Sequence, residues 1–97
     1  MSAKNFNLDF HSAQPLLTSH ARERSIERQI SAKQIRLVFS HGDLRAPAKD
    51  GRMECQISHR AAMRLRWLGI GPRNISLLTS IVLIIAESGS ILTAYRC

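Results

Sequence analysis

The chain is poor in the residues from which several classes of protein are built. Its 97 residues include two cysteines, three prolines, five glycines and seven acidic side chains. Two cysteines do not have the number or the spacing of a disulfide-rich secreted domain. Free thiols are more typical of proteins in the reducing cytoplasm. The longest apolar run, at 75–86, is too short to cross a bilayer. We therefore expect a cytoplasmic protein without a signal peptide that does not enter a membrane.

Several motifs of catalytic and metal sites are also missing. The sequence contains neither the G-x-S-x-G of serine hydrolases nor the G-x-x-x-x-G-K of phosphate loops. The seven carboxylates include no clustered aspartate pair that would hold Mg²⁺. Cys55 and His59 are spaced C-x-x-x-H, but no second Cys/His pair follows. We expect no metal ion and no cofactor, so any enzymatic chemistry would be metal-independent.

What the chain does have is positive charge. The chain contains fourteen lysines and arginines but only seven acidic residues, which gives a net charge of +7 and an isoelectric point near 10.8. Eleven of the fourteen are arginines, the residue better suited to bidentate phosphate contacts and to stacking on bases. This balance favours a polyanionic partner, most often a nucleic acid. An acidic protein partner stays open, because charge alone does not separate the two.

Helix signals mark the first half of the chain. Thr18 or Ser19 follows Pro15 and can cap a helix. Ser31 begins an S-x-x-Q capping box, and Gly42 can end the helix that follows. The predicted elements are a weak edge strand around 6–10, helices at 19–29, 32–41 and 59–69, and strands at 52–58, 78–86 and 91–96.

The order of these elements predicts the fold class. Helices come first and strands mostly afterwards, which is typical of an α+β domain with helices on one face of an antiparallel sheet. Residues 43–51 contain Pro47 and are expected to be loop or edge structure. Residues 69–74 are expected to be a linker turn. Gly89 then joins two apolar runs, predicting a terminal hairpin at the centre of the sheet.

Three motifs resemble a known family. "HARERSIERQIS" is similar to His-Ala-x-x-Arg-x-x-x-Arg-x-Ile-Ser, the signature of the bacterial domain-of-unknown-function family four-two-five-eight. "RMECQISHRAAMRLRWLG" resembles its strand and arginine-containing helix, and "SGSILTAYR" resembles its last strand. The resemblance covers about 18–96, so 1–17 would be an N-terminal extension and 18–97 one domain. Gln29 stands where the family has a glycine.

The resemblance implies a fold and an activity. The fold would be two N-terminal helices packed on a small antiparallel sheet, as in the RelE-type toxin ribonucleases, with a further helix before the C-terminal hairpin. Members of the family occur as small stand-alone proteins and as toxin tips of larger secreted ones. A toxin of this kind would act on RNA and would be restrained by an acidic antitoxin or immunity protein.

The first candidate site lies on the first predicted helix. His20, Arg24 and Arg28 follow one another at i, i+4 spacing and form one ridge. One interpretation is a solvated face in which glutamates pair with the arginines. The other is a catalytic cleft, with Thr93 and Tyr95 of the last strand facing the ridge. The predicted catalytic residues are His20, Arg24 and Tyr95.

A second ridge lies on the third predicted helix. Arg60, Arg64 and Trp67 share one face, with Arg66 beside them. Cations next to an aromatic ring are typical of surfaces that bind single-stranded nucleic acid, although tryptophan is more often a core or interface residue. The predicted nucleic-acid-binding residues are Arg28, Arg60, Arg64, Trp67, Thr93 and Arg96.

These observations lead to one functional expectation and two alternatives. In RNA the ribose 2′-hydroxyl attacks its own phosphodiester, so the protein needs an acid, a base and cations. Histidine exchanges protons near neutral pH, which suits His20 to such a role. We expect a metal-independent endoribonuclease of bacterial toxin type whose partner is RNA. The alternatives are a non-catalytic basic nucleic-acid-binding module and a protein-interaction domain with an acidic partner.

Overall fold

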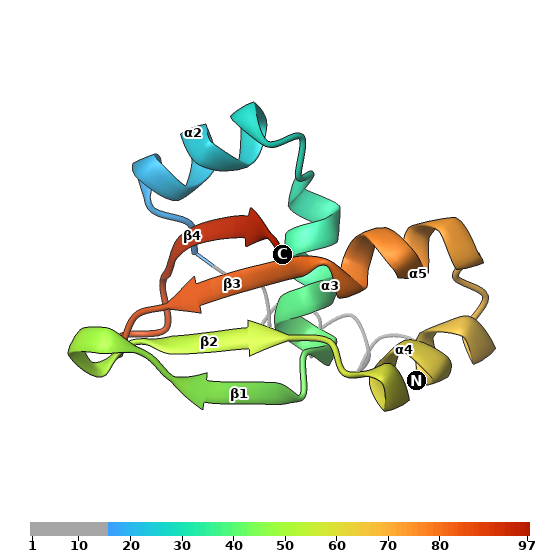
Figure 1. Ribbon diagram of the computed structural model, residues 1–97. Coiled ribbons are helices and arrows are strands. Elements are labelled where there is room, and N and C mark those ends of the chain that lie inside the picture. The colour runs from blue at the N-terminus through green and yellow to red at the C-terminus, as the bar shows by residue number, and fades with distance from the viewer. Residues whose placement is uncertain (1–15) are drawn as a thin grey trace, which may run out of the picture.

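A computed structural model describes residues 16–97 of the chain (Figure 1). The strand predicted around 6–10 lies outside the described residues. Within them, no helix is long and apolar enough to cross a membrane. The elements in chain order are α2 (Ser19–Glu27), α3 (Ala32–His41), β1 (Leu44–Pro47), the short 3-10 helix η1 (Lys49–Gly51), β2 (Met53–Gln56), α4 (His59–Trp67), α5 (Pro72–Thr79), β3 (Ile81–Ile85) and β4 (Ile91–Arg96).

The four strands form one antiparallel sheet in the order β1-β2-β3-β4. Helices packed on this sheet give the α+β class that the sequence predicts. The expectation that the whole terminal hairpin lies at the centre is wrong, because of its two strands β3 lies between two neighbours whereas β4 is an edge strand. Pro47 lies in β1, the other edge strand, where its missing N–H costs no ladder hydrogen bond.

The core lies between the sheet and α3, which crosses one face of the sheet (Figure 1). Ile35 and Val38 of α3 are buried with Cys55 of β2 and Leu83 of β3. The helix and the sheet approach so closely that a Cβ on Gly42 would lie 2.5 Å from both Cys55 Sγ and the Val38 carbonyl oxygen. Glycine is therefore required at this position by close approach.

Both predicted N-terminal caps are present. Thr18 accepts a hydrogen bond from the Ala21 N–H at 3.1 Å and begins α2. Ser31 and Gln34 form the reciprocal capping box at 3.1 and 2.9 Å and begin α3. The predicted break between the two helices is confirmed. It contains Gln29, whose φ of 57° lies in the left-handed region.

The structure corrects the prediction for the segment before β3. Residues 69–74 are not only a linker, and the strand does not begin at 78, because Pro72–Thr79 is helical. Pro72 occupies the first helical turn, where its missing N–H costs nothing. Ile75 and Leu78 then follow at helical i, i+3 spacing, and Leu78 is buried. The apolar run that looked continuous therefore divides into a helix and a strand.

An irregularity in β4 changes which side chains share a face. Ile84 pairs with Thr93 but the next residue, Ile85, pairs with Ile91, so Leu92 is an extra residue in β4. Ile91 is consequently buried in the core. The alternation of a regular strand would place Ile91 on the face of Thr93 and Tyr95; this expectation is wrong for Ile91, because the extra residue turns it to the opposite face.

The free edge of β4 is covered by the segment that leads into α2. Leu17 forms a parallel bridge with Ile91. The Thr18 N–H donates to the Ile91 carbonyl at 3.1 Å, and the Ile91 N–H donates to the Leu16 carbonyl at 2.8 Å. These bonds fix the start of α2 against the start of β4, and so determine where the first helical turn lies.

Asp43 holds the first turn of α4. Its carboxylate accepts hydrogen bonds from the Ser58 hydroxyl at 2.6 Å and the Ser58 N–H at 2.9 Å. Ser58 is the N-cap of α4 and accepts from the Ala61 N–H. The hydroxyl bond is the main cause of a lowered Asp43 pKa, followed by the backbone bond.

We expect Asp43 to contribute to a loss of stability at acid pH. A carboxyl with a lowered folded-state pKa stabilises the fold above its unfolded pKa, and this contribution disappears as the pH falls through the folded value. Urea unfolding from neutral to acid pH measures it. Asp43→Asn and Ser58→Ala should both make the free energy of unfolding less dependent on pH. Acid profiles parallel to that of the wild type would contradict this role.

Candidate active-site groove

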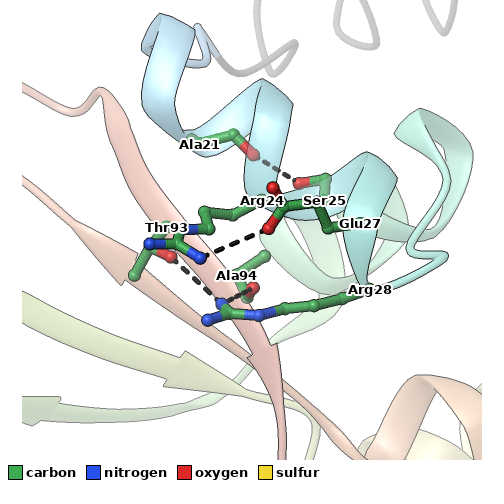
Figure 2. A network of polar contacts seen from close by, with 7 residues as sticks. All are labelled: Ala21, Arg24, Ser25, Glu27, Arg28, Thr93 and Ala94. Carbon is green, nitrogen blue, oxygen red and sulfur yellow. Dashed lines mark hydrogen bonds and ion pairs between the residues drawn. The ribbon is translucent and has the colours of Figure 1, made fainter.

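Two arginines, Arg28 and Arg96, connect the α2 segment to β4, and Figure 2 shows the contacts of Arg28. Arg28 donates to the Ala94 carbonyl at 2.8 Å and to the Thr93 hydroxyl at 3.4 Å. In the opposite direction, Arg96 donates to the Gln29 carbonyl at 3.0 Å. Both guanidinium groups, predicted from the sequence to bind nucleic acid, are thus engaged in holding the helix on the strand.

The buried face of α2 is made of small residues. Ala21 and Ser25 are buried against the sheet, and the Ser25 hydroxyl donates to the Ala21 carbonyl at 2.7 Å (Figure 2). Arg24 lies on the exposed side, where it donates to Glu27 at 3.2 Å. An exposed pair of this kind contributes little to stability. The glutamate pairing considered for the ridge therefore exists for Arg24, whereas Arg28 pairs with the strand.

An open groove of about 1120 Å³ lies beside the first turn of α2. It extends across the sheet to the loop between β1 and β2, on the face turned away from α3. His20 and Thr93, both predicted site residues, line it together. The polar lining residues are Thr18, His20, Lys49, Arg52, Glu54 and Thr93, and the apolar ones are Pro47, Ala48, Ile84 and Leu92.

The β1–β2 loop presents the two cations of the groove. The Arg52 N–H donates to the Lys49 carbonyl at 3.1 Å, and the Ala48 N–H donates to the Arg52 carbonyl at 2.8 Å. Between them Asp50 and Gly51 have φ angles of 59° and 72°, in the left-handed region that glycine and aspartate tolerate best. The tight turn therefore brings Lys49 and Arg52 to the same side of the sheet.

Glu54 is the acidic residue of the groove. Along β2 it alternates with the buried Cys55, and it pairs with Ala46 on one side and Ile84 on the other. Its side chain is half-buried on the face that carries Thr93. No motif in the sequence marks Glu54, Lys49 or Arg52 as site residues, although strand alternation separates Glu54 from the core positions.

Thr93 is prepared as a hydrogen-bond donor toward the groove. Its hydroxyl oxygen accepts from Arg28, and an arginine can only donate. The hydroxyl proton of Thr93 therefore remains available for an acceptor, such as a phosphate oxygen. The predicted role of Thr93 in binding and the observed role of Arg28 in positioning are linked through this one contact.

Tyr95 does not line the groove. It pairs with Val82, two residues along β4 from Thr93 and on the same face of the sheet. Burial raises the pKa of its hydroxyl, and the negative charges of Glu54 and Cys97 raise it further. The phenol is consequently protonated at neutral pH and close enough to Glu54 to be influenced by its charge.

The remaining predicted residues lie elsewhere. Arg24, Arg28 and Arg96 do not line the groove, although Arg28 contacts its Thr93. Arg60, Arg64 and Trp67 are on α4, which follows the far end of β2 (Figure 1). The sequence predicts His20, Arg24, Thr93 and Tyr95 in one cleft, and of these the groove combines His20 with Thr93.

Side chains that could bind a metal ion are not clustered in the described residues. Within residues 16–97, no three side chains of the His, Cys, Asp and Glu types lie together in a way that could hold a metal ion. Cys55 lies in the core rather than in the groove, and its thiol donates weakly to the Val38 and Gly42 carbonyls, at 3.7 Å each. Burial raises the pKa of this thiol, so it is a poor nucleophile at neutral pH.

The groove thus offers an imidazole, a carboxylate, two cations and a hydroxyl group on one open surface. The similarity to family four-two-five-eight rests on the residues quoted above and stays a prediction. No protein-family model, no curated protein and no solved structure matches this chain.

Proposed function

We propose that the protein is a metal-independent endoribonuclease, of the kind found among bacterial toxins, and that its active site is the groove beside α2. The observation that carries this proposal is the presence of His20 and Glu54 in one groove with Lys49 and Arg52. An acid, a base and phosphate-binding cations are the groups that cleavage by the 2′-hydroxyl requires. His20 reaches the groove from α2, Glu54 from β2, and both cations from the β1–β2 loop.

The reaction assigns one role to each titratable group. The Glu54 carboxylate removes the proton from a ribose 2′-hydroxyl, whose oxygen attacks the adjacent phosphorus. The bond from phosphorus to the 5′-oxygen breaks, and the His20 imidazolium gives its proton to the departing oxygen. The products are a 2′,3′-cyclic phosphate and a 5′-hydroxyl, and proton exchange with solvent restores both side chains.

The cations of the groove stabilise the charge that develops on phosphorus. Lys49 and Arg52 can neutralise the non-bridging oxygens, and the Thr93 hydroxyl can donate to one of them. The N-terminus of α2 lies at the same place, and the positive end of a helix dipole favours an anion. This environment supports the excess negative charge of a pentacovalent phosphate.

A cleavage assay tests the proposal directly. The protein is incubated with an end-labelled RNA in the presence of a chelator, and the product ends are identified by chromatography. We expect cleavage with 2′,3′-cyclic phosphate ends. The matched control is the same RNA with a single 2′-deoxyribose at the cleaved position, which should resist cleavage there.

Two other results would point to the alternative functions. Tight RNA binding without cleavage would favour a non-catalytic nucleic-acid-binding module. Weak RNA binding that salt abolishes, together with a tight acidic protein partner, would favour an interaction domain. Cleavage of the deoxy-substituted position, or dependence on a divalent ion, would contradict the 2′-hydroxyl mechanism.

A further inference from the structure

The outer face of α4 is apolar and cationic at the same time. Arg60, Met63, Arg64 and Trp67 follow at i, i+3 and i+4 spacing and are exposed. Trp67 is 87% exposed, although burying an indole ring normally stabilises a protein. A shallow hollow of about 350 Å³ lies against the ring, lined by Met63, Arg66 and Trp67.

Among residues 16–97, the outer face of α4 is not packed into the core. The inner face of α4 contributes Ala61, Ala62 and Leu65 to the core. Leu68 follows Ala61 and Leu65 at helical spacing, but the helix ends at Trp67 and Leu68 is 72% exposed. Trp67 is thus not part of the core, so packing in the core does not explain why a tryptophan stands at this position.

The charged side chains of α4 itself are all cationic. Between Glu54 and Glu87 the chain has no acidic residue but has four arginines, three of them on α4. Within the described part of the chain, neither Arg60 nor Arg66 takes part in an ion pair. Arg64 acts on Asp43, whose pKa it helps to lower. The face is therefore complementary to a polyanion.

We propose that this face of α4 binds single-stranded RNA, with an unpaired base stacked on Trp67 and phosphates held by Arg60 and Arg66. Charge alone fits any polyanion, but an exposed indole between guanidinium groups matches alternating bases and phosphates. A duplex hides the faces of its bases inside the stack, so it does not supply the same contact. The proposal deepens the proposed function, because it names the form of the RNA.

The face is separate from the groove. β2 begins at the groove with Glu54 close to its start, and α4 follows the other end of β2 (Figure 1). No residue lines both the groove and the hollow beside Trp67. Binding at α4 can therefore be measured without any cleavage in the groove.

Trp67 is the single tryptophan of the sequence, so its fluorescence reports on this face alone. The probe is an unstructured 2′-O-methyl RNA of about twelve nucleotides, within the usual site size of single-strand binders. This RNA cannot be cleaved through its 2′-oxygen. We expect the single strand to quench Trp67, and its duplex with a complementary strand to quench it much less at equal phosphate concentration.

Substitutions separate stacking from charge. Trp67→Leu should weaken binding of the labelled probe, measured by anisotropy, by about 5- to 100-fold, the usual effect of losing one stacked base. Trp67→Phe should retain most of the affinity, and Leu77→Ala, at an exposed apolar position on α5, should retain all of it. Arg60→Gln should reduce the dependence of the affinity on salt concentration by about 0.7 in logarithmic slope.

Three outcomes would overturn the proposal. They are equal quenching by single strand and duplex, unchanged affinity of Trp67→Leu, and displacement of the probe by polyglutamate as readily as by unlabelled RNA. The last result would assign the face to an acidic protein. If instead the groove is not an active site, the protein will bind an unmodified RNA without cleaving it. The two failures can therefore be distinguished.

Discussion

Replacing His20 with alanine is expected to slow RNA cleavage by about 10²- to 10⁴-fold, the usual contribution of a positioned acid or base. Glu54→Gln should cause a loss of similar size, because the amide cannot accept the 2′-hydroxyl proton. The double variant should lose much less than the product of the two effects, since the groups act in one reaction. Single-turnover cleavage rates measure all three.

The control for His20 is another exposed histidine. His41 lies at the last position of α3 and does not line the groove, so His41→Ala should cleave like the wild type. His20 is also exposed, and its removal should change the free energy of unfolding by no more than about 0.5 kcal/mol. If His20→Ala cleaves at the rate of His41→Ala, the groove is not the active site.

Leu83→Ala is expected to cause the largest loss of stability, about 2–5 kcal/mol. Leu83 is fully buried in the central strand, between Cys55 of β2 and Ala94 of β4. Whole domains are stable by only about 5–15 kcal/mol, so this one substitution removes a large part of the total. Urea unfolding at neutral pH measures the change.

The matched control is a leucine in the same sheet. Leu44 lies in β1 and is 52% exposed, so Leu44→Ala should change the free energy of unfolding by no more than about 0.5 kcal/mol. Equal losses in the two variants would mean that the core does not lie between β3 and α3.

The sequence predicts the elements that have explicit end signals. The capping box at Ser31 and the apolar spacing that follows it predict α3 to within a residue. Where an end signal is missing, the predicted boundary of an element is wrong. The stretch from Leu77 to Ala86 is mostly apolar, so the sequence predicts one strand there. The structure instead ends α5 at Thr79 within this stretch. Within the run, composition alone could not separate the buried Leu83 from Ile84, which faces the groove.

The candidate site was only partly predictable for a different reason. Sequence motifs predict His20 and Thr93 as site residues, but the groove also needs the β1–β2 loop, which lies across the sheet from them. No local pattern relates Lys49 and Arg52 to His20, which is about thirty residues earlier in the chain. Only pairing of β2 with β3 and of β3 with β4 brings these side chains together.

The two edges of the sheet also affect how copies of the chain can associate. In β4 the N–H and the carbonyl of Ile91 are already hydrogen-bonded to Leu16 and Thr18. The Ala94 carbonyl accepts a hydrogen bond from Arg28. At the other edge, Pro47 has no N–H to offer and Arg45 adds a charge. Neither edge is a good template for strand addition by another copy. The two edges of the sheet therefore disfavour its extension by the strands of other copies.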